Sequence, residues 1–217
     1  KVATDKVNKQ IEQIDKIMDK YDKGAMLVGE GPLTKDLINI TDTDFKRVSA
    51  VSIGIVFVII LLLFKSVTIP VILVGVIEFA IFVNMGIPFY TGTKLPFVAS
   101  IVIGTIQLGA TVDYAILMTT RYQRERSRGA GKFDAITTAH KFSAQSIIVS
   151  ALSFFAATIG VGLYSNIDMI SSLCILMARG ALISMVVVVL ILPSLFMVFD
   201  KIIVKTSKGF QPSGLKS

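Results

Sequence analysis

The sequence predicts an all-α integral membrane fold, in which five transmembrane helices follow the end of an α+β extracytoplasmic domain. Hydrophobic residues make up 53% of the chain, charged residues only 17%, and the mean hydropathy is +0.73. A soluble domain of this size has no reason to be so apolar. Long apolar segments recur between residues 48 and 199, and a segment of about 20 apolar residues is what a bilayer requires. Cations gather in only some of the connecting loops, which is typical of an oriented membrane protein.

Residues 1–46 are polar and are predicted to be the carboxyl-terminal edge of a porter-like extracytoplasmic domain. Apolar residues recur there at helical spacing over residues 1–23, namely Val7, Ile11, Ile14, Met18 and Tyr21, so this stretch is an expected amphipathic helix. Residues 25–28 precede a Gly-Glu-Gly-Pro turn and predict a short strand. A second polar helix is expected from Thr34. So short a stretch cannot bury a sufficient core alone, and we expect the rest of that domain elsewhere in the same polypeptide.

The apolar segments predict a transmembrane bundle over residues 47–199, followed by a cytoplasmic tail at 200–217. The five spans are expected at about 48–64, 67–85, 96–120, 142–163 and 169–199. The last is too long for one straight crossing, so its first ten or so residues are expected to form a separate surface helix. A short cytoplasmic helix at the membrane surface is expected over residues 133–141.

Loop charges predict the orientation of the bundle. Lysines and arginines cluster at 121–141 and 200–217, whereas 86–95 and 164–168 contain only Lys94. Because cytoplasmic loops carry the excess of cations, residues 1–46 are predicted to be extracytoplasmic and the carboxyl terminus cytoplasmic. An earlier span is then expected upstream of residue 1, to carry this start across the membrane.

Asp113 lies inside the third apolar segment, beside Tyr114. It precedes Arg121 by eight residues, which places it about 12 Å from the cytoplasmic end of the span. A carboxylate at that depth costs a few kcal/mol and is by default a functional residue, often a proton carrier. The alternative is a structural acid paired with one cation. Tyr114 points about 100° away from Asp113, along a polar stripe made of Ser100, Gly104, Gln107, Thr111 and Tyr114.

Three further features of the spans are candidates for a structural or functional role. Glu78 and Arg179 both fall in the outer half of the membrane, where they are candidates for a buried ion pair that neutralises both charges. The alternatives are snorkelling of Arg179 to the interface and, for Glu78, a solvated cavity or a second proton site. The fourth span has a face of small residues at helical spacing, which lets another helix approach closely: Ser143, Ser146, Ser150, Ser153, Ala157 and Gly160.

Several classes of chemistry are not expected. The single cysteine, Cys174, excludes an internal disulfide and a cysteine-based metal site. The sequence has no phosphate-binding glycine loop, metal-ligand spacing or nucleophile pattern, so we expect no enzyme, cofactor or metal. The net charge of +7 lies at the edges of spans, which indicates membrane lipids rather than nucleic acid as partners.

The segment Gly109-Ala110-Thr111-Val112-Asp113-Tyr114-Ala115-Ile116-Leu117, followed by Arg121-Tyr122-Gln123-Arg124-Glu125, resembles the resistance-nodulation-division (RND) superfamily, specifically its MMPL-like branch. The resemblance continues at Phe64-Lys65-Ser66, at residues 135–139 and at residues 192–196, and it covers nearly all of 47–200. Arg179-Gly180 departs from the family pattern, because many relatives have a neutral residue there, and Glu78 matches no family motif.

The resemblance implies two pseudo-repeated halves, each with one helix, a large extracytoplasmic domain and five more helices. This chain is similar to one half of such an RND-type bundle, and its polar tail favours the carboxyl-terminal half. Asp113 and Tyr114 then match the proton-relay position of an exporter of lipids or other hydrophobic compounds, driven by the proton-motive force in a bacterial plasma membrane. The implied partners are the other half and the porter domain, with homo-oligomers left open. The alternative is a sterol-sensing-like or secretion-accessory module that binds lipid without pumping.

Overall fold

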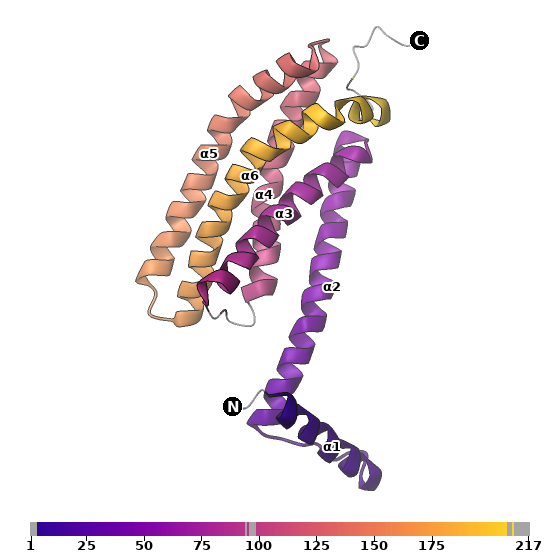
Figure 1. Cartoon of the computed structure of the whole chain (residues 1–217), viewed down its shortest axis with the longest axis vertical. Helices are drawn as coiled ribbons and strands as arrows, with labels where there is room; N and C mark the ends of the chain where they lie inside the picture. Colours follow the sequence, from indigo (N-terminus) through magenta and orange to yellow (C-terminus); the bar gives the residue numbers. More distant parts are fainter. Residues whose placement is uncertain (1–3, 94, 96–98, 208–209, 211–217) are drawn as a thin grey trace. The chain divides into compact units, whose positions relative to one another are not determined.

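The computed structural model describes residues 4–93, 95, 99–207 and 210, and its regular structure in this part of the chain is entirely helical. Figure 1 shows the helices in chain order: α1 (Asp5–Tyr21), α2 (Glu30–Phe64), α3 (Thr68–Thr91), α4 (Ala99–Ser127), α5 (Lys132–Tyr164) and α6 (Asp168–Thr206). The side chain of Ser100 and the predicted outer cation Lys94 lie outside the described residues, as do 208–209 and 211–217 of the predicted tail.

Five of these helices, α2 to α6, are long and apolar enough to cross a membrane. The prediction of an all-α, multi-pass membrane protein with five spanning helices is therefore confirmed. The helices extend beyond the apolar segments, because polar residues continue the same helices past each end. In α2 the apolar part begins near Val48, although the helix itself begins at Glu30.

The chain divides into two compact units, Lys1–Arg47 and Val48–Ser217. In the first unit, α1 packs on the start of α2 through the buried Ile11, whose Cδ1 lies 3.4 Å from where a Cβ on Gly31 would be. A salt bridge of 3.2 Å joins Lys35 Nζ to Glu12 Oε1. This unit is thus a pair of helices that meet at a small apolar contact.

The predicted strand at residues 25–28 is wrong, because these residues form an irregular loop. Met26 and Val28 are more than four-fifths exposed. A strand is stable only beside another strand that takes up its backbone hydrogen bonds, and the described residues supply none. The Gly24 amide instead donates to Asp22 Oδ1 at 2.9 Å, in a turn just after α1.

In the second unit, helices α3 to α6 lie side by side, and α4 and α6 each contact the three others. Short connections of three or four residues join α4 to α5 and α5 to α6, as in antiparallel helical bundles. A left-handed residue ends α3 at Gly92, with φ of 65°, and Gly129 follows α4 with φ of 91°. Glycine adopts this conformation without strain, so both helices end where it occurs.

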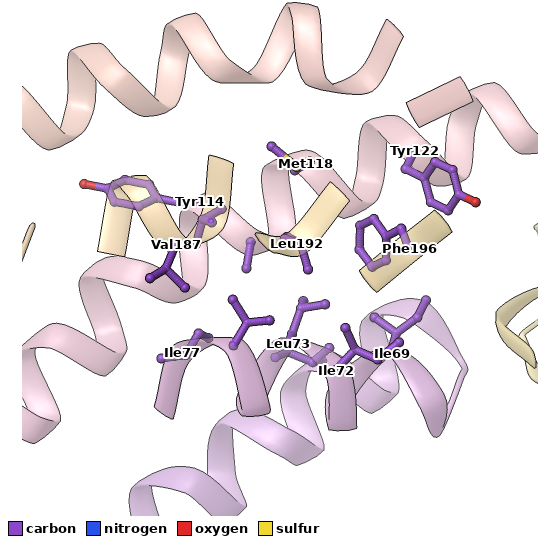
Figure 2. Close-up of a cluster of buried hydrophobic side chains, with 14 of the residues drawn as sticks. Ile69, Ile72, Leu73, Ile77, Tyr114, Met118, Tyr122, Val187, Leu192 and Phe196 are labelled. Atoms are coloured by element: carbon purple, nitrogen blue, oxygen red, sulfur yellow. The ribbon is translucent and has the colours of Figure 1, made fainter. Parts of the chain in front are cut away.

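The core of this unit lies where α3, α4 and α6 meet. Figure 2 shows Leu73 and Ile77 of α3 facing Met118 of α4 and Leu192 and Phe196 of α6. All five side chains are fully or almost fully buried. The buried face of α4 contributes to this core, and α4 packs against α3, α5 and α6.

Two predicted helix breaks are absent. Residues 133–141 belong to α5 and residues 169–178 belong to α6, each as part of one continuous helix. A change from apolar to polar composition ends a span without ending the helix, and neither stretch contains Gly or Pro to interrupt it. With 39 residues, α6 is about 58 Å long at about 1.5 Å per residue.

Candidate functional site

Asp113 and Tyr114 occupy different faces of α4, as their helical spacing predicts. Asp113 is exposed, and the described residues give it no hydrogen bond or ion pair. Tyr114 is only 6% exposed and belongs to the hydrophobic core, with its ring near Val187 in Figure 2. The carboxyl group therefore faces out of the described bundle, while its neighbour faces in.

The face of α4 that carries Tyr114 is buried against α6 through polar contacts. Gln107 Nε2 donates to Ser184 Oγ at 3.0 Å, and Thr111 Oγ1 donates to the same oxygen at 2.8 Å. Gln107 and Thr111 were predicted as members of the polar stripe. The structure adds Ser184 of α6, which is 1% exposed, as the group that joins them.

The polar contacts continue from α4 to α3 through Asn84. The Asn84 Nδ2 atom donates to Gln107 Oε1 at 2.8 Å and to the Leu176 carbonyl at 3.2 Å. Arg179 Nε donates to Asn84 Oδ1 at 2.8 Å. We call the connected set the polar chain; it crosses three helices and consists of Arg179, Asn84, Gln107, Ser184 and Thr111.

Gly180 makes the polar chain possible. A Cβ at this position would stand 2.7 Å from both Asn84 Nδ2 and Gln107 Oε1, closer than Cβ atoms in proteins approach other atoms. Only a glycine therefore lets α3 and α4 approach α6 here with their amide groups still in hydrogen-bond contact. Arg179 thus supplies the cation of the polar chain, and Gly180 beside it leaves the space that the two amide side chains occupy.

The predicted ion pair between Glu78 and Arg179 does not form in the structure. Arg179 uses its guanidinium on Asn84, with Nη2 donating to the Asn84 backbone carbonyl at 2.8 Å. Glu78 is half-buried on α3 and makes no ion pair among the described residues. Asn84, the residue that Arg179 contacts instead, was missed by sequence reasoning. The available signal was an amide side chain inside the second apolar segment.

A second polar cluster lies at the other end of α4. Tyr122 donates to Asp200 Oδ1 at 2.5 Å, and Arg126 binds both oxygens of Asp200 at 3.1 Å. The side chains of Arg126 and Asp200 are 19% and 8% exposed. The Tyr122 ring also stacks on Phe196, with centroids 5.0 Å apart.

This cluster joins α4 to α6 and was not predicted. The basic stretch after residue 120 was interpreted as a signal of topology and of contact with membrane lipids, whereas Tyr122 and Arg126 within it join α4 to α6. Arg126 Nη1 also donates to the Ala130 carbonyl at 2.8 Å, so the same side chain holds the loop before α5. The bidentate pair with Asp200 is well placed to fix the end of α6.

The small residues of α5 divide between two faces. Ser143 is fully buried, with no hydrogen-bond partner among the described residues. The others are exposed in the described bundle: Ser146, Ser150, Ser153, Ala157 and Gly160. Within this chain α5 packs through Ala139, Ser143, Ile147 and Ala151 instead. The packing role of the exposed stripe stays a prediction.

Comparisons with known proteins place these features in a family. A family model described as MMPL family matches residues 1–211. YdgH of Bacillus subtilis (strain 168) is 25% identical over 149 residues, which is 64% of this chain and 16% of that protein. SCO0839 of Streptomyces coelicolor (strain ATCC BAA-471 / A3(2) / M145) is 28% identical over 118 residues, covering 52% of this chain and 16% of that protein. The names of both describe them as membrane proteins, and the matches take in about a sixth of their length.

Proposed function

The chain belongs to the MMPL family, which implies a membrane transporter-like module, and on this premise we propose that it is part of an exporter driven by the proton-motive force. The cargo is a lipid or another hydrophobic compound. No covalent chemistry and no cofactor are part of the proposal. The observation that carries it is the exposed carboxyl group of Asp113, which has no partner among the described residues and lies within a helix apolar enough to span a membrane.

A charged carboxylate inside the bilayer costs free energy, so an acid in this position is by default a functional residue. The cost of a charged carboxylate inside the bilayer is about 2.5 kcal/mol or more, and no cation among the described residues offsets it. The adjacent Gly109 is open, because no other helix of the described chain lies within 4 Å of where its Cβ would stand. A helix from the remainder of the polypeptide can approach this small-residue face closely and bring a partner to the carboxyl group.

Tyr114 is the proposed relay partner of Asp113, acting through groups on neighbouring helices. Its side chain lines a small cavity with Gln107 and Thr111, two members of the polar chain. A phenol both donates and accepts hydrogen bonds, so it can pass a proton to groups on this side of α4. Because the two side chains occupy different faces, the path between them runs through a helix of the other half.

The proposal includes an orientation. The basic end of α4 and the start of α5 face the cytoplasm of a bacterial cell, together with the carboxyl terminus, and residues 1–46 are extracytoplasmic. The distribution of lysine and arginine supports this arrangement. The partners are membrane lipids, the remainder of the same polypeptide and, in some assemblies, further copies of the chain.

A second candidate function, favoured by one observation, is a module that binds lipid without pumping. An apolar groove of about 490 Å³ lies between α3 and α6 and is lined by Thr68, Val71, Ile72, Gly75, Val76, Phe79, Ile191, Leu195, Phe199 and Ile202. Such a groove suits an acyl chain whether or not protons move. The two functions differ in their response to a pH gradient.

Asp113→Asn in the full-length protein tests the proposal. Proteoliposomes with an imposed pH gradient are loaded with a pH-sensitive dye and a fluorescent phospholipid, so that proton flux and lipid movement are read together. We expect Asp113→Asn to lose both and the Asp113→Glu control to keep a measurable part of each. Undiminished proton-driven movement in the Asn variant would overturn the proposal. Lipid binding that ignores the gradient in the unmodified protein would favour the second candidate.

A further inference from the structure

The basic ends of α4 and α5 enclose a cavity that the proposed transport does not use. Its volume is about 190 Å³, and it is lined by Arg121, Arg124, Glu125, Arg128, Thr138, Ala139 and Phe142. A second cavity of about 180 Å³ shares two of these arginines and extends along α4 to Thr120 and Leu117. Because the two cavities share Arg121 and Arg124, we treat them together as one cationic recess, which includes the apolar side chains of Leu117 and Phe142.

The charges in this recess are unequally satisfied. Arg128 Nη1 donates to Glu125 Oε1 at 2.8 Å, so the one acid among the described lining residues already has a partner. Arg121 and Arg124 make no ion pair with any described residue. Two guanidinium groups therefore line the same recess without a counter-charge.

Arg121 carries the clearest sign that an acceptor belongs here. Its Nε is fully buried and has no hydrogen-bond partner among the described residues, although such a donor is costly to leave unpaired. Its Cζ lies 5.9 Å from the centre of the Phe142 ring, which holds the guanidinium against the wall of the recess. A guanidinium fixed in this way presents its remaining N–H groups in a fork that fits phosphate oxygens.

The position of the recess favours the phosphate of a lipid headgroup over a free phosphate ion. Arg121 is eight residues from Asp113, about 12 Å along α4, so the recess opens where the span meets the headgroup layer. Leu117 lies one turn deeper, on the membrane side of the arginines, and Phe142 of α5 is 56% exposed beside them. A polar headgroup with attached acyl chains matches this order of charged and apolar surface better than a free anion does.

We propose that the recess binds the phosphate of an anionic phospholipid. Arg121 and Arg124 donate hydrogen bonds to its oxygens, and Phe142 and Leu117 contact the start of an acyl chain. This is a defined site, distinct from the diffuse attraction of basic loops to an anionic leaflet. The proposal does not depend on proton-coupled transport.

The test measures lipid binding by the purified full-length protein in neutral detergent, with native mass spectrometry as the readout. Short-chain phosphatidylglycerol is the probe, and phosphatidylcholine of the same chain length is the neutral comparison. We expect the double variant Arg121→Gln/Arg124→Gln to weaken phosphatidylglycerol binding about tenfold or more, since each charged hydrogen-bonding group is lost. The matched control Lys132→Gln/Lys141→Gln removes the same charge nearby, outside the recess, and is expected to change binding by less than about twofold.

Further variants keep the result interpretable. Arg121→Lys/Arg124→Lys preserves the charge and the packing but not the fork, and is expected to bind at an intermediate level. Phe142→Ala is expected to weaken binding of the lipid but not of glycerol phosphate. Equal losses in the arginine and lysine pairs would overturn the site in favour of diffuse electrostatics. Binding of inorganic phosphate as tight as that of the lipid would overturn the lipid as its occupant.

Discussion

Arg179 makes two hydrogen bonds to Asn84, from Nε to the side-chain oxygen and from Nη2 to the backbone carbonyl, both of 2.8 Å. The cation is thus satisfied by an amide on α3 rather than by a carboxylate. Asn84 in turn donates to Gln107. Asn84 of α3 is thus the member of the polar chain that links Arg179 of α6 to Gln107 of α4.

Asn84→Ala is therefore expected to destabilise the protein. Hydrogen bonds between membrane helices are worth about 0.6 kcal/mol on average and at most about 1.7, and this change removes side-chain bonds to both Arg179 and Gln107. We expect a loss of about 1–2 kcal/mol in the free energy of unfolding. Unfolding of the full-length protein in detergent, followed by circular dichroism, measures it. A loss no greater than that of Thr120→Ala, a change at an exposed position of α4, would contradict this role.

Glu78→Gln and Arg179→Gln are expected to have additive effects on unfolding. The two residues do not bond to each other in the structure, and changes at residues without shared contacts add to within about 0.5 kcal/mol. Asn84→Ala combined with Arg179→Gln should instead cost less than the sum of the two. A coupling of more than about 1 kcal/mol between Glu78 and Arg179 would restore the ion pair that the sequence suggested.

Gly180→Ala is expected to be more damaging than its single methyl group suggests. The added Cβ would meet Asn84 Nδ2 and Gln107 Oε1 at 2.7 Å, so two buried amides must shift and lose hydrogen bonds. Overpacking of this kind costs about 1–3 kcal/mol. Gly86→Ala on α3 is the matched control, because its Cβ would meet nothing within 4 Å and alanine favours the helix. Equal unfolding midpoints for the two variants would contradict the close contact.

Asp200→Asn is expected to destabilise the carboxyl-terminal ends of α4 and α6. It leaves the largely buried Arg126 without its counter-charge, and removal of one member of a buried pair costs about 3–5 kcal/mol. Because Arg126 keeps one-fifth of its exposure, the lower end of that range is expected. Tyr122→Phe removes only the hydroxyl and should cost about 1 kcal/mol. Limited proteolysis at the loop near Ala130, compared between the variants, locates the effect, and cleavage unchanged from the unmodified protein would contradict it.

Hydropathy located the spans because a membrane-spanning helix must present an apolar surface long enough to cross the bilayer. The segment around Asp113 also identified the family, and the match over residues 1–211 confirms that resemblance. Hydropathy could not locate the helix ends, because α5 begins ten residues before its apolar part without any residue that interrupts a helix. The predicted strand at 25–28 was wrong because a strand needs a neighbouring strand to take up its hydrogen bonds, and a local pattern does not show whether such a neighbour exists.

The side-chain contacts were the least predictable part. Arg126 and Asp200 are 74 residues apart, and Arg179 and Asn84 are 95 apart, so no local pattern connects them. Arg179 contacts Asn84 rather than Glu78. Gly180, the next residue, leaves room for the Asn84 side chain to lie against α6. Sequence reasoning identified some polar residues of the apolar segments, such as Gln107 and Thr111, and packing decided which residues they contact.

Substitutions at Ser143 and Ser150 of α5 test two kinds of packing, one inside this bundle and one against another helix. Ser143 is fully buried without a hydrogen-bond partner among the described residues, whereas Ser150 is exposed on the small-residue stripe. Ser143→Ala removes an unsatisfied hydroxyl and is expected to stabilise the protein by about 1 kcal/mol. Ser143→Leu overpacks the same site and should destabilise it by about 1–3 kcal/mol.

Ser150→Leu is expected to leave the unfolding midpoint of the 217-residue chain unchanged, since its side chain enters open space there. In the full-length protein the same change is expected to lower the midpoint, because a bulky side chain on a small-residue face keeps a second helix away. Leu152→Ile, at a neighbouring exposed position, is the control for changes on the lipid side. If Ser150→Leu lowers neither midpoint, α5 faces lipid along this stripe, and the predicted packing face is wrong.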